Sequence, residues 1–161
     1  MTQPVKKILK KIDKKVSNKS KQPKTNRRKH KEYGTSKLEE RFAHNFLDAL
    51  DVRYVYQFKA ESIGRYFDFY LPDHNILIEV DGDYWHSYNV LEEQMTPTQK
   101  RNRRVDEQKN HWALSNCIPL YRVWEHEINK HPEKVKERLK DILGKSRKQK
   151  IIDENKKKRH N

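Results

Sequence analysis

The spacing of apolar residues predicts three helices in the central part of the chain. Between residues 36 and 50, apolar side chains recur every three or four positions, as on the buried face of a helix. Ser36 and Glu39 form a capping-box pattern at the start of this segment. Two further helices are predicted, one from about Pro97 to Asn116 and one that begins at Pro132 and ends at Gly144.

Four other segments have the alternation, or the β-branched and aromatic composition, of strands. They are residues 52–59, 65–71, 76–81 and 118–124, and turn-forming residues at 72–75 join the second strand to the third. A helix that crosses over between the third and fourth strands requires a mixed sheet with helices packed on it. The sequence therefore predicts an α/β fold with a four-stranded or slightly larger sheet flanked by helices.

The third strand ends in acidic residues, which is a poor way to build a plain hydrophobic core. Side chains alternate between the two faces of a strand. In the third strand, one face carries Leu77, Glu79 and Asp81, and the other carries Ile76, Ile78 and Val80. In the second strand, one face carries Tyr66, Asp68 and Tyr70, and the other carries Phe67, Phe69 and Leu71. The turn between the two strands then brings Asp68 opposite Glu79.

Converging carboxylates repel one another unless a cation lies between them, and Mg²⁺ prefers oxygen ligands of this kind. His86, just beyond Gly82, adds a group that exchanges protons near neutral pH. The pattern thus predicts a functional site. The alternative is that Asp68 and Asp81 end their strands and face water. Glu39 borders the buried stripe of the first helix, and its alternative role is capping alone.

The charge of the chain is concentrated at its ends. The chain has 161 residues, 37% of them charged, and a formal net charge of +14. Residues 1–33 contain 13 Lys and Arg against two acids, and residues 145–161 contain 8 against two, so residues 34–144 carry a net charge of −3. We therefore expect a slightly acidic folded domain over residues 34–144, with a basic N-terminal extension and a basic C-terminal tail.

Basic arms bind polyanions because each phosphate that they neutralise releases counterions, so both extensions are candidates for DNA binding. The alternative is a solubility device or a localisation signal. Aliphatic residues recur at near-helical spacing in the first twenty residues, which also fits a basic amphipathic helix on a membrane surface, although that face has no aromatic anchor. Residues 17–33 have the composition of a linker.

The single cysteine, Cys117, excludes an internal disulfide and a pair of CxxC zinc ligands, which fits a reducing compartment. No apolar run approaches the roughly 20 residues of a membrane span, and the Lys-rich N-terminus lacks the apolar core of a signal peptide. We expect an intracellular protein, in the cytoplasm or nucleoid of a prokaryotic or phage-infected cell, with no membrane partner.

Several motifs in this order resemble those of known nucleases. Asp68 followed by Glu79-Val80-Asp81 resembles the PD-(D/E)xK nuclease core, with Asp81 at the place of the usual lysine. Within that superfamily the chain is more similar to the very short patch repair endonucleases and the related EDxHD homing endonucleases. Their Gly-x-aromatic-Trp-His, Asn-x-x-x-Asp and Val-Trp-Glu motifs are matched by Gly82 to His86, by Asn102 to Asp106, and by Val123-Trp124-Glu125. The resemblance covers roughly residues 36 to 128.

The resemblance implies a restriction-endonuclease-like core and a role for each matching residue. Asp68 would be the main metal carboxylate, with the Val80 carbonyl and Glu79 completing the ligand set around Mg²⁺ or Mn²⁺. His86 would be the general base, oriented by Asp106. Glu39 matches the family's acid on the first helix, and Asp81 is placed with the catalytic residues. The patch repair enzymes also hold a structural zinc through Cys and His ligands, and with Cys117 alone no such zinc is expected here.

The resemblance also implies DNA contacts. Tyr84 and Trp85 match an aromatic pair that wedges into DNA, although a Trp beside a sheet is more often part of a core. The predicted helix from Pro97 carries Lys100, Arg101, Arg103 and Arg104 on its early turns, where they would contact phosphates or form a solvated helix face.

The sequence thus favours a metal-dependent endonuclease that hydrolyses phosphodiester bonds of double-stranded DNA, of the homing or site-specific nicking kind. One alternative is a non-catalytic basic nucleic-acid-binding protein on a nuclease-like scaffold. Another is a restriction or RNA-cleaving enzyme on the same core, because the metal chemistry is shared.

Overall fold

The computed structural model of the protein describes residues 36–158. The amphipathic helix and linker expected within residues 1–33 lie outside the described residues. In chain order the elements are α2 (Lys37–Phe42), the π-helical turn η1 (Ala43–Leu47), the 3₁₀ turn η2 (Asp48–Leu50), β1 (Val55–Ala60), β2 (Arg65–Leu71), β3 (Ile76–Asp81), the 3₁₀ turn η3 (Glu92–Gln94), α3 (Pro97–Ser115), β4 (Leu120–Trp124), α4 (Glu125–Lys130) and α5 (Pro132–Lys158).

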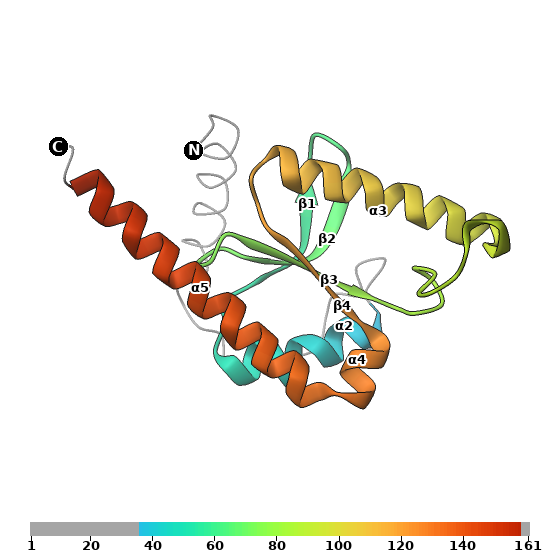
Figure 1. The fold of residues 1–161 in the computed structure, drawn as a ribbon, viewed down its shortest axis with the longest axis horizontal. Helices are drawn as coiled ribbons and strands as arrows, with labels where there is room; N and C mark the ends of the chain where they lie inside the picture. Colours follow the sequence, from blue (N-terminus) through green and yellow to red (C-terminus); the bar gives the residue numbers. More distant parts are fainter. Residues whose placement is uncertain (1–35, 159–161) are drawn as a thin grey trace, which may run out of the picture.

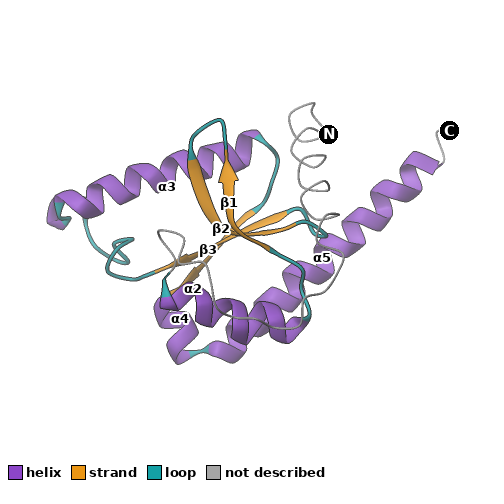
Figure 2. Ribbon diagram, turned by 180° about the vertical axis from the view of Figure 1, so that it is seen from behind, coloured by secondary structure: helices purple, strands orange, loops and turns teal. Residues whose placement is uncertain are grey.

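The strands form one sheet in the order β1-β2-β3-β4 (Figure 1). β1, β2 and β3 are antiparallel neighbours, whereas β4 runs parallel to β3 after the crossover through α3. Seen from the front and from behind, α3 covers one face of the sheet, and α2, α4 and α5 cover the other (Figures 1 and 2). The predicted α/β fold with a mixed, four-stranded sheet is confirmed.

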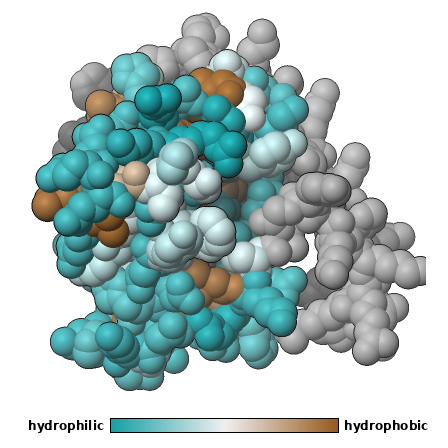
Figure 3. All heavy atoms as spheres, turned by 90° about the vertical axis from the view of Figure 1, so that its right-hand side faces the viewer, coloured by the Kyte–Doolittle hydropathy of each residue, from teal (hydrophilic) through white to brown (hydrophobic). Residues whose placement is uncertain are grey.

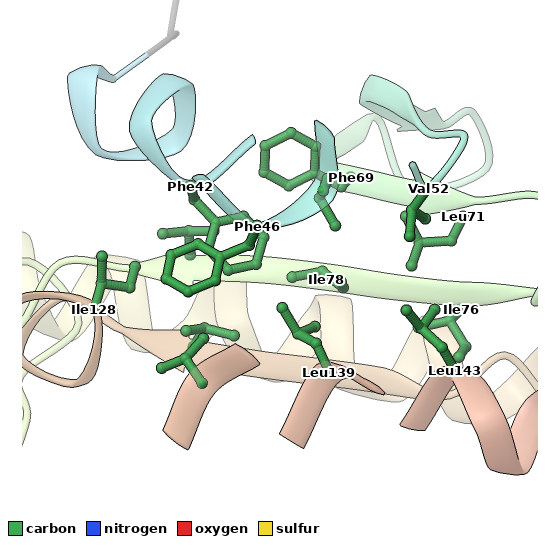
Figure 4. Close-up of a cluster of buried hydrophobic side chains, with 14 residues drawn as sticks. Phe42, Phe46, Val52, Phe69, Leu71, Ile76, Ile78, Ile128, Leu139 and Leu143 are labelled. Atoms are coloured by element: carbon green, nitrogen blue, oxygen red, sulfur yellow. The ribbon is translucent and has the colours of Figure 1, made fainter. Parts of the chain in front are cut away.

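The larger core lies between the sheet and the helices α2, α4 and α5 (Figure 4). Phe42 stacks on Phe46 at a centroid distance of 5.1 Å and reaches Phe69 of β2 at 5.7 Å. Ile78 of β3 and Leu139 of α5 close the same layer and are almost fully buried. Full burial of a side chain of this size contributes on the order of 2 kcal/mol, so this layer provides much of the stability of the fold.

A second core lies between the sheet and α3, where Trp112 packs against Phe58 and Phe67. Phe67 was expected on the same face as Phe69, and this prediction was wrong, because Phe69 belongs to the other core. The reason is a change of face in both strands of the β1–β2 hairpin. In β1, likewise, Tyr56 packs with the first core and Phe58 with the second.

At the N-terminal end of the domain, one helix type and one strand boundary differ from the predictions. The first helical segment covers the expected residues, but it continues from α2 into a π-helical and then a 3₁₀ turn. Ser36 caps it as predicted, since its Oγ accepts a hydrogen bond from Glu39 N at 3.2 Å. The first strand begins at Val55 rather than at residue 52.

The C-terminal helix does not end at Gly144, as was predicted, but continues to Lys158. A glycine ends a helix when it adopts the left-handed conformation, and among the described glycines only Gly64 has a positive φ. Two contacts support the helix around Gly144: an ion pair between Lys145 and Asp141 at 2.7 Å, and a hydrogen bond of 2.8 Å from Ser146 Oγ to the carbonyl of His74. At least this part of the predicted C-terminal tail is therefore a continuation of α5. In the part of the chain that the structure describes, no helix is long and apolar enough to span a membrane.

Candidate active site at the carboxyl end of strand β3

Asp68 and Glu79 lie where β2 separates from β3. The last backbone pair of these strands is Phe69 with Ile78. Beyond this pair, hydrogen bonds between backbone N–H groups and side-chain carboxylates take the place of backbone-to-backbone bonds. Asp68 N donates to Glu79 Oε1 at 3.2 Å, and Val80 N donates to Asp68 Oδ2 at 2.7 Å. The predicted opposition of Asp68 and Glu79 is confirmed. One oxygen of each carboxylate accepts a hydrogen bond from a backbone N–H of the other strand, and these two bonds fix both side chains.

The surroundings of Asp68 disfavour its charge. Burial raises the pKa of Asp68 well above its usual value, and the charges of Glu79 and Glu39 raise it further, against the Val80 N–H and Lys109. Burial also raises the pKa of Glu79, although Lys109 opposes this effect. A cation bound beside buried carboxylates lowers their pKa values and so favours their ionised form.

Lys109 of α3 was missed from the sequence. Its Nζ lies 2.6 Å from Glu79 Oε2, and its side chain is largely buried. The sequence places Asp81 where the usual lysine would stand, and in the structure α3 brings the ammonium group of Lys109 to this region. Both oxygens of Glu79 are thus already hydrogen-bonded. A lysine among the many charged residues of α3 carries no signal that separates it from a solvated one.

Glu39 reaches this region from α2 and is buried. Its Oε2 accepts hydrogen bonds from Tyr56 Oη and from Gln57 Nε2, each at 2.9 Å. Its carboxylate therefore contacts β1 and does not close the capping box with Ser36, so capping alone is not its role. Burial and the hydrogen bond to Glu39 raise the pKa of Tyr56, which keeps its hydroxyl protonated as a donor.

His86 and Asp106 form a hydrogen-bonded pair, with Nδ1 and Oδ2 2.8 Å apart. Nδ1 is also 3.5 Å from Asp81 Oδ1. Burial alone would lower the pKa of His86, but the hydrogen bond with Asp106 and the charges of Asp81 and Asp106 outweigh it, so the pKa is raised. The other ring nitrogen, Nε2, has no hydrogen-bond partner among the described residues. The side chain is 23% exposed, so the ring is in partial contact with solvent.

Arg122 of β4 holds the two carboxylates beside His86. It donates from Nη1 to Asp81 Oδ2 at 2.7 Å and from Nη2 to Asp106 Oδ1 at 3.2 Å. Burial would lower the pKa of Arg122, but Asp81 and Asp106 raise it above its usual value. Burial likewise opposes ionisation of Asp106, and His86 and Arg122 together lower its pKa. An arginine inside an otherwise apolar strand was the signal that could have identified this residue.

The turn that carries His86 is tied to two helices. Gln99 Nε2 donates to the carbonyl of Tyr84 at 2.7 Å, and Asn102 Nδ2 donates to that of Trp85 at 3.1 Å. Asp83 Oδ1 lies 2.7 Å from His126 Nδ1 at the start of α4. This pairing was missed, because Asp83 and His126 are 43 residues apart and no local pattern links them.

Tyr84 and Trp85 project from this turn and are 61% and 56% exposed. They form an edge-to-face pair with centroids 5.0 Å apart, so neither ring belongs to the core. The end of the molecule that carries this turn faces the viewer in Figure 3, where pale residues of intermediate hydropathy gather in a mostly hydrophilic surface.

The four basic residues on the early turns of α3 are exposed, but they differ in their partners. Arg103 lies 3.9 Å from Glu92 and 3.7 Å from Glu107. Lys100, Arg101 and Arg104 have no acidic partner among the described residues. These three side chains are thus available for an anion.

The donors around Asp68 are suited to a hard cation. Asp68 Oδ1 and Glu39 Oε1 accept no hydrogen bond from the described residues. The carbonyl of Val80 lies on the same strand edge as the N–H that binds Asp68. Among residues 36–158, however, no three His, Cys, Asp or Glu side chains are grouped to hold a metal ion. The fitting set is therefore two carboxylates and a carbonyl, with Glu79 already bound by Lys109.

A comparison with protein-family models found no match, and a comparison with curated proteins found none either. The family resemblance therefore rests on the motifs themselves. The structure brings Asp68 and Glu79 together, and His86 with Asp81 and Asp106, at the end of the sheet where β3 finishes.

Proposed function

We propose that the protein is a metal-dependent DNA endonuclease that hydrolyses phosphodiester bonds, of the homing or site-specific nicking kind. The observation that supports this most is the His86–Asp106 pair, whose Nε2 has no partner among the described residues, just beyond the end of β3, the strand whose Glu79 and Val80 contact Asp68. An accessible imidazole backed by a carboxylate can act as a general base, and a buried carboxylate whose ionisation is disfavoured, such as Asp68, is suited to binding a cation.

The residues divide the reaction between them. His86 Nε2 takes the proton of the water that attacks the phosphorus. As the new P–O bond forms, the bond from phosphorus to the leaving sugar oxygen breaks, and that oxygen takes a proton from solvent water. Asp106 keeps the proton of the ring on Nδ1 and stabilises the imidazolium that results. Arg122 lowers the pKa of Asp106 and donates hydrogen bonds to both Asp106 and Asp81 beside the ring.

The metal ligands would be Asp68, the Val80 carbonyl and Glu39, with Glu79 and Lys109 fixing Asp68 in place. A bound Mg²⁺ or Mn²⁺ would supply positive charge for the phosphate oxygens during hydrolysis. Exposed Tyr84 and Trp85, with Lys100, Arg101 and Arg104, form a surface of aromatic and basic residues that suits duplex DNA.

The deciding experiment is cleavage of supercoiled plasmid in Mg²⁺, scored for nicked and linear product. His86→Ala and Asp68→Asn are expected to abolish cleavage and to leave DNA binding nearly intact. His111→Ala, an exposed histidine on α3, is the matched control and should cut like the parent.

Asp68→Asn should also be at least as stable as the parent in the absence of metal, because it removes a buried charge with unfavourable neighbours. Loss of cleavage in this variant cannot then be attributed to unfolding. A parent protein that binds plasmid but never cuts it in Mg²⁺ or Mn²⁺ would support the non-catalytic nucleic-acid-binding alternative.

A further inference from the structure

Gln57 has a backbone conformation that is unusual for its position. Its φ is +51°, in the left-handed region, although it lies inside β1. The other described non-glycine residues with positive φ lie in turns: Asp51, Asn75, Ser87, Asn89 and Cys117. Glutamine has no special tolerance for this region, so the surrounding structure must hold it there against an energetic preference. Such strain is found where a fold positions a functional group.

The strained residue lies directly opposite Asp68. The β1–β2 ladder pairs Tyr56 with Phe69 and Phe58 with Phe67, and the pair between them, Gln57 and Asp68, is missing from it. This is also the point at which both strands change the core that they face. The left-handed residue therefore lies at the position where the ladder beside Asp68 is interrupted.

The amide of Gln57 is directed at Glu39. Its Nε2 donates to Glu39 Oε2 at 2.9 Å, the same oxygen that Tyr56 Oη contacts. Two donors on one oxygen fix the buried carboxylate and leave Oε1 without a hydrogen bond from the described residues. A regular strand would turn the side chain at position 57 to a different direction.

We propose that Gln57 is a positioning residue, held in a strained conformation so that its amide fixes Glu39 as a ligand of the catalytic cation. This inference rests on the endonuclease function proposed above. Gln57 itself touches neither the cation nor the DNA.

The strain is tested by comparing Gln57→Gly with Gln57→Ala. Both variants lose the amide, but only glycine adopts a positive φ without a penalty. At an ordinary strand position the alanine variant would be the more stable one. Here the glycine variant should melt about 3 to 6 °C above the alanine variant. If the alanine variant melts at the same temperature as the glycine variant or higher, Gln57 is not strained, and the proposal is overturned.

The positioning role is tested by the binding of Mn²⁺ alone, followed through the electron paramagnetic resonance signal of the free ion. Loss of a group that orients a ligand weakens metal affinity about 10- to 100-fold. We expect this loss in both variants, although the glycine variant is the more stable of the two. Gln57→Asn tolerates a positive φ but is too short to reach Glu39, and it should behave like the glycine variant. Gln108→Ala, which removes an exposed glutamine on α3, is the control and should bind like the parent.

The outcomes separate this inference from the proposed function. If the parent binds Mn²⁺ and cuts plasmid and the Gln57 variants do the same, the positioning role is overturned and the endonuclease function stands. If the parent neither binds Mn²⁺ nor cuts, both proposals are overturned. Weaker Mn²⁺ binding in the three variants, with the glycine variant more stable than the alanine variant, supports the inference.

Discussion

His86 Nδ1 and Asp106 Oδ2 are 2.8 Å apart, so the turn after β3 is joined to the middle of α3 by a charge-assisted contact. The pKa of His86 is raised and that of Asp106 is lowered, as expected when each stabilises the charged form of the other.

The first prediction concerns pH. A general base must be deprotonated, so cleavage should fall as the pH drops through the raised pKa of His86. Asp106→Asn removes a negative charge beside the imidazolium, which lowers the pKa of His86 and moves the acidic limb of the kcat/KM profile to lower pH. The plateau should fall about 10²-fold or more, because the ring loses its oriented tautomer. An acidic limb that stays in place in Asp106→Asn would show that His86 is not the titrating base.

The second prediction concerns stability. Asp81 is 1% exposed, and Arg122 carries the cation within hydrogen-bond distance of it. Arg122→Met removes the hydrogen-bonded cation from this buried carboxylate, which keeps only His86 Nδ1 at 3.5 Å, and should cost about 3 kcal/mol of unfolding free energy, measured by urea denaturation. Adding Asp81→Asn to Arg122→Met should recover part of the loss. If the double variant is no more stable than Arg122→Met, the cost does not come from the loss of the cation beside Asp81.

The third prediction separates binding from folding at the exposed aromatic pair. Trp85→Ala should change the unfolding free energy by less than about 0.5 kcal/mol, because the ring lies outside the core. It should weaken DNA binding, since an aromatic wedge adds contact with unstacked bases. Leu114→Ala, at an exposed apolar residue near the other end of α3, is the control and should alter neither quantity. Equal DNA affinity in Trp85→Ala and the parent contradicts the wedge.

The fourth prediction concerns the three unpaired cations of α3. Replacing Lys100, Arg101 and Arg104 by Gln should reduce the slope of log K against log salt by about 2 to 3 for duplex DNA, one unit for each lost phosphate contact. Arg103→Gln removes a cation that is already near Glu92 and Glu107, so its slope should change less. A triple variant with the slope of the parent would show that this face of α3 does not contact DNA.

Sequence reasoning located the parts of the site that depend on local pattern. β2 and β3 have the predicted bounds, because alternation and a four-residue turn determine them. The approach of Asp68 to Glu79 followed from the same turn. The prediction for Phe67 was wrong because alternation assumes a regular strand, and a left-handed residue at position 57 interrupts it.

The residues that were missed act over long separations. Arg122 is 41 residues from Asp81, and Lys109 is 30 residues from Glu79. Their partners are determined by the register of β4 on β3 and by the rotation of α3, which no local pattern specifies. The end of α5 was placed too early because a glycine was taken as a stop, whereas Ser146 anchors the helix to the turn before β3.

The change of face at Gln57 and Asp68 has a consequence for the cooperativity of the domain. Glu39 comes from the helical layer on one side of the sheet, and Asp106 and Lys109 come from α3 on the other. Asp68 lies in the sheet between these two layers. Glu39 and Lys109 therefore come together around it only when both layers are packed on the sheet. Local unfolding of either layer would dismantle the site before the rest of the domain opens, and activity then reports the integrity of the whole domain.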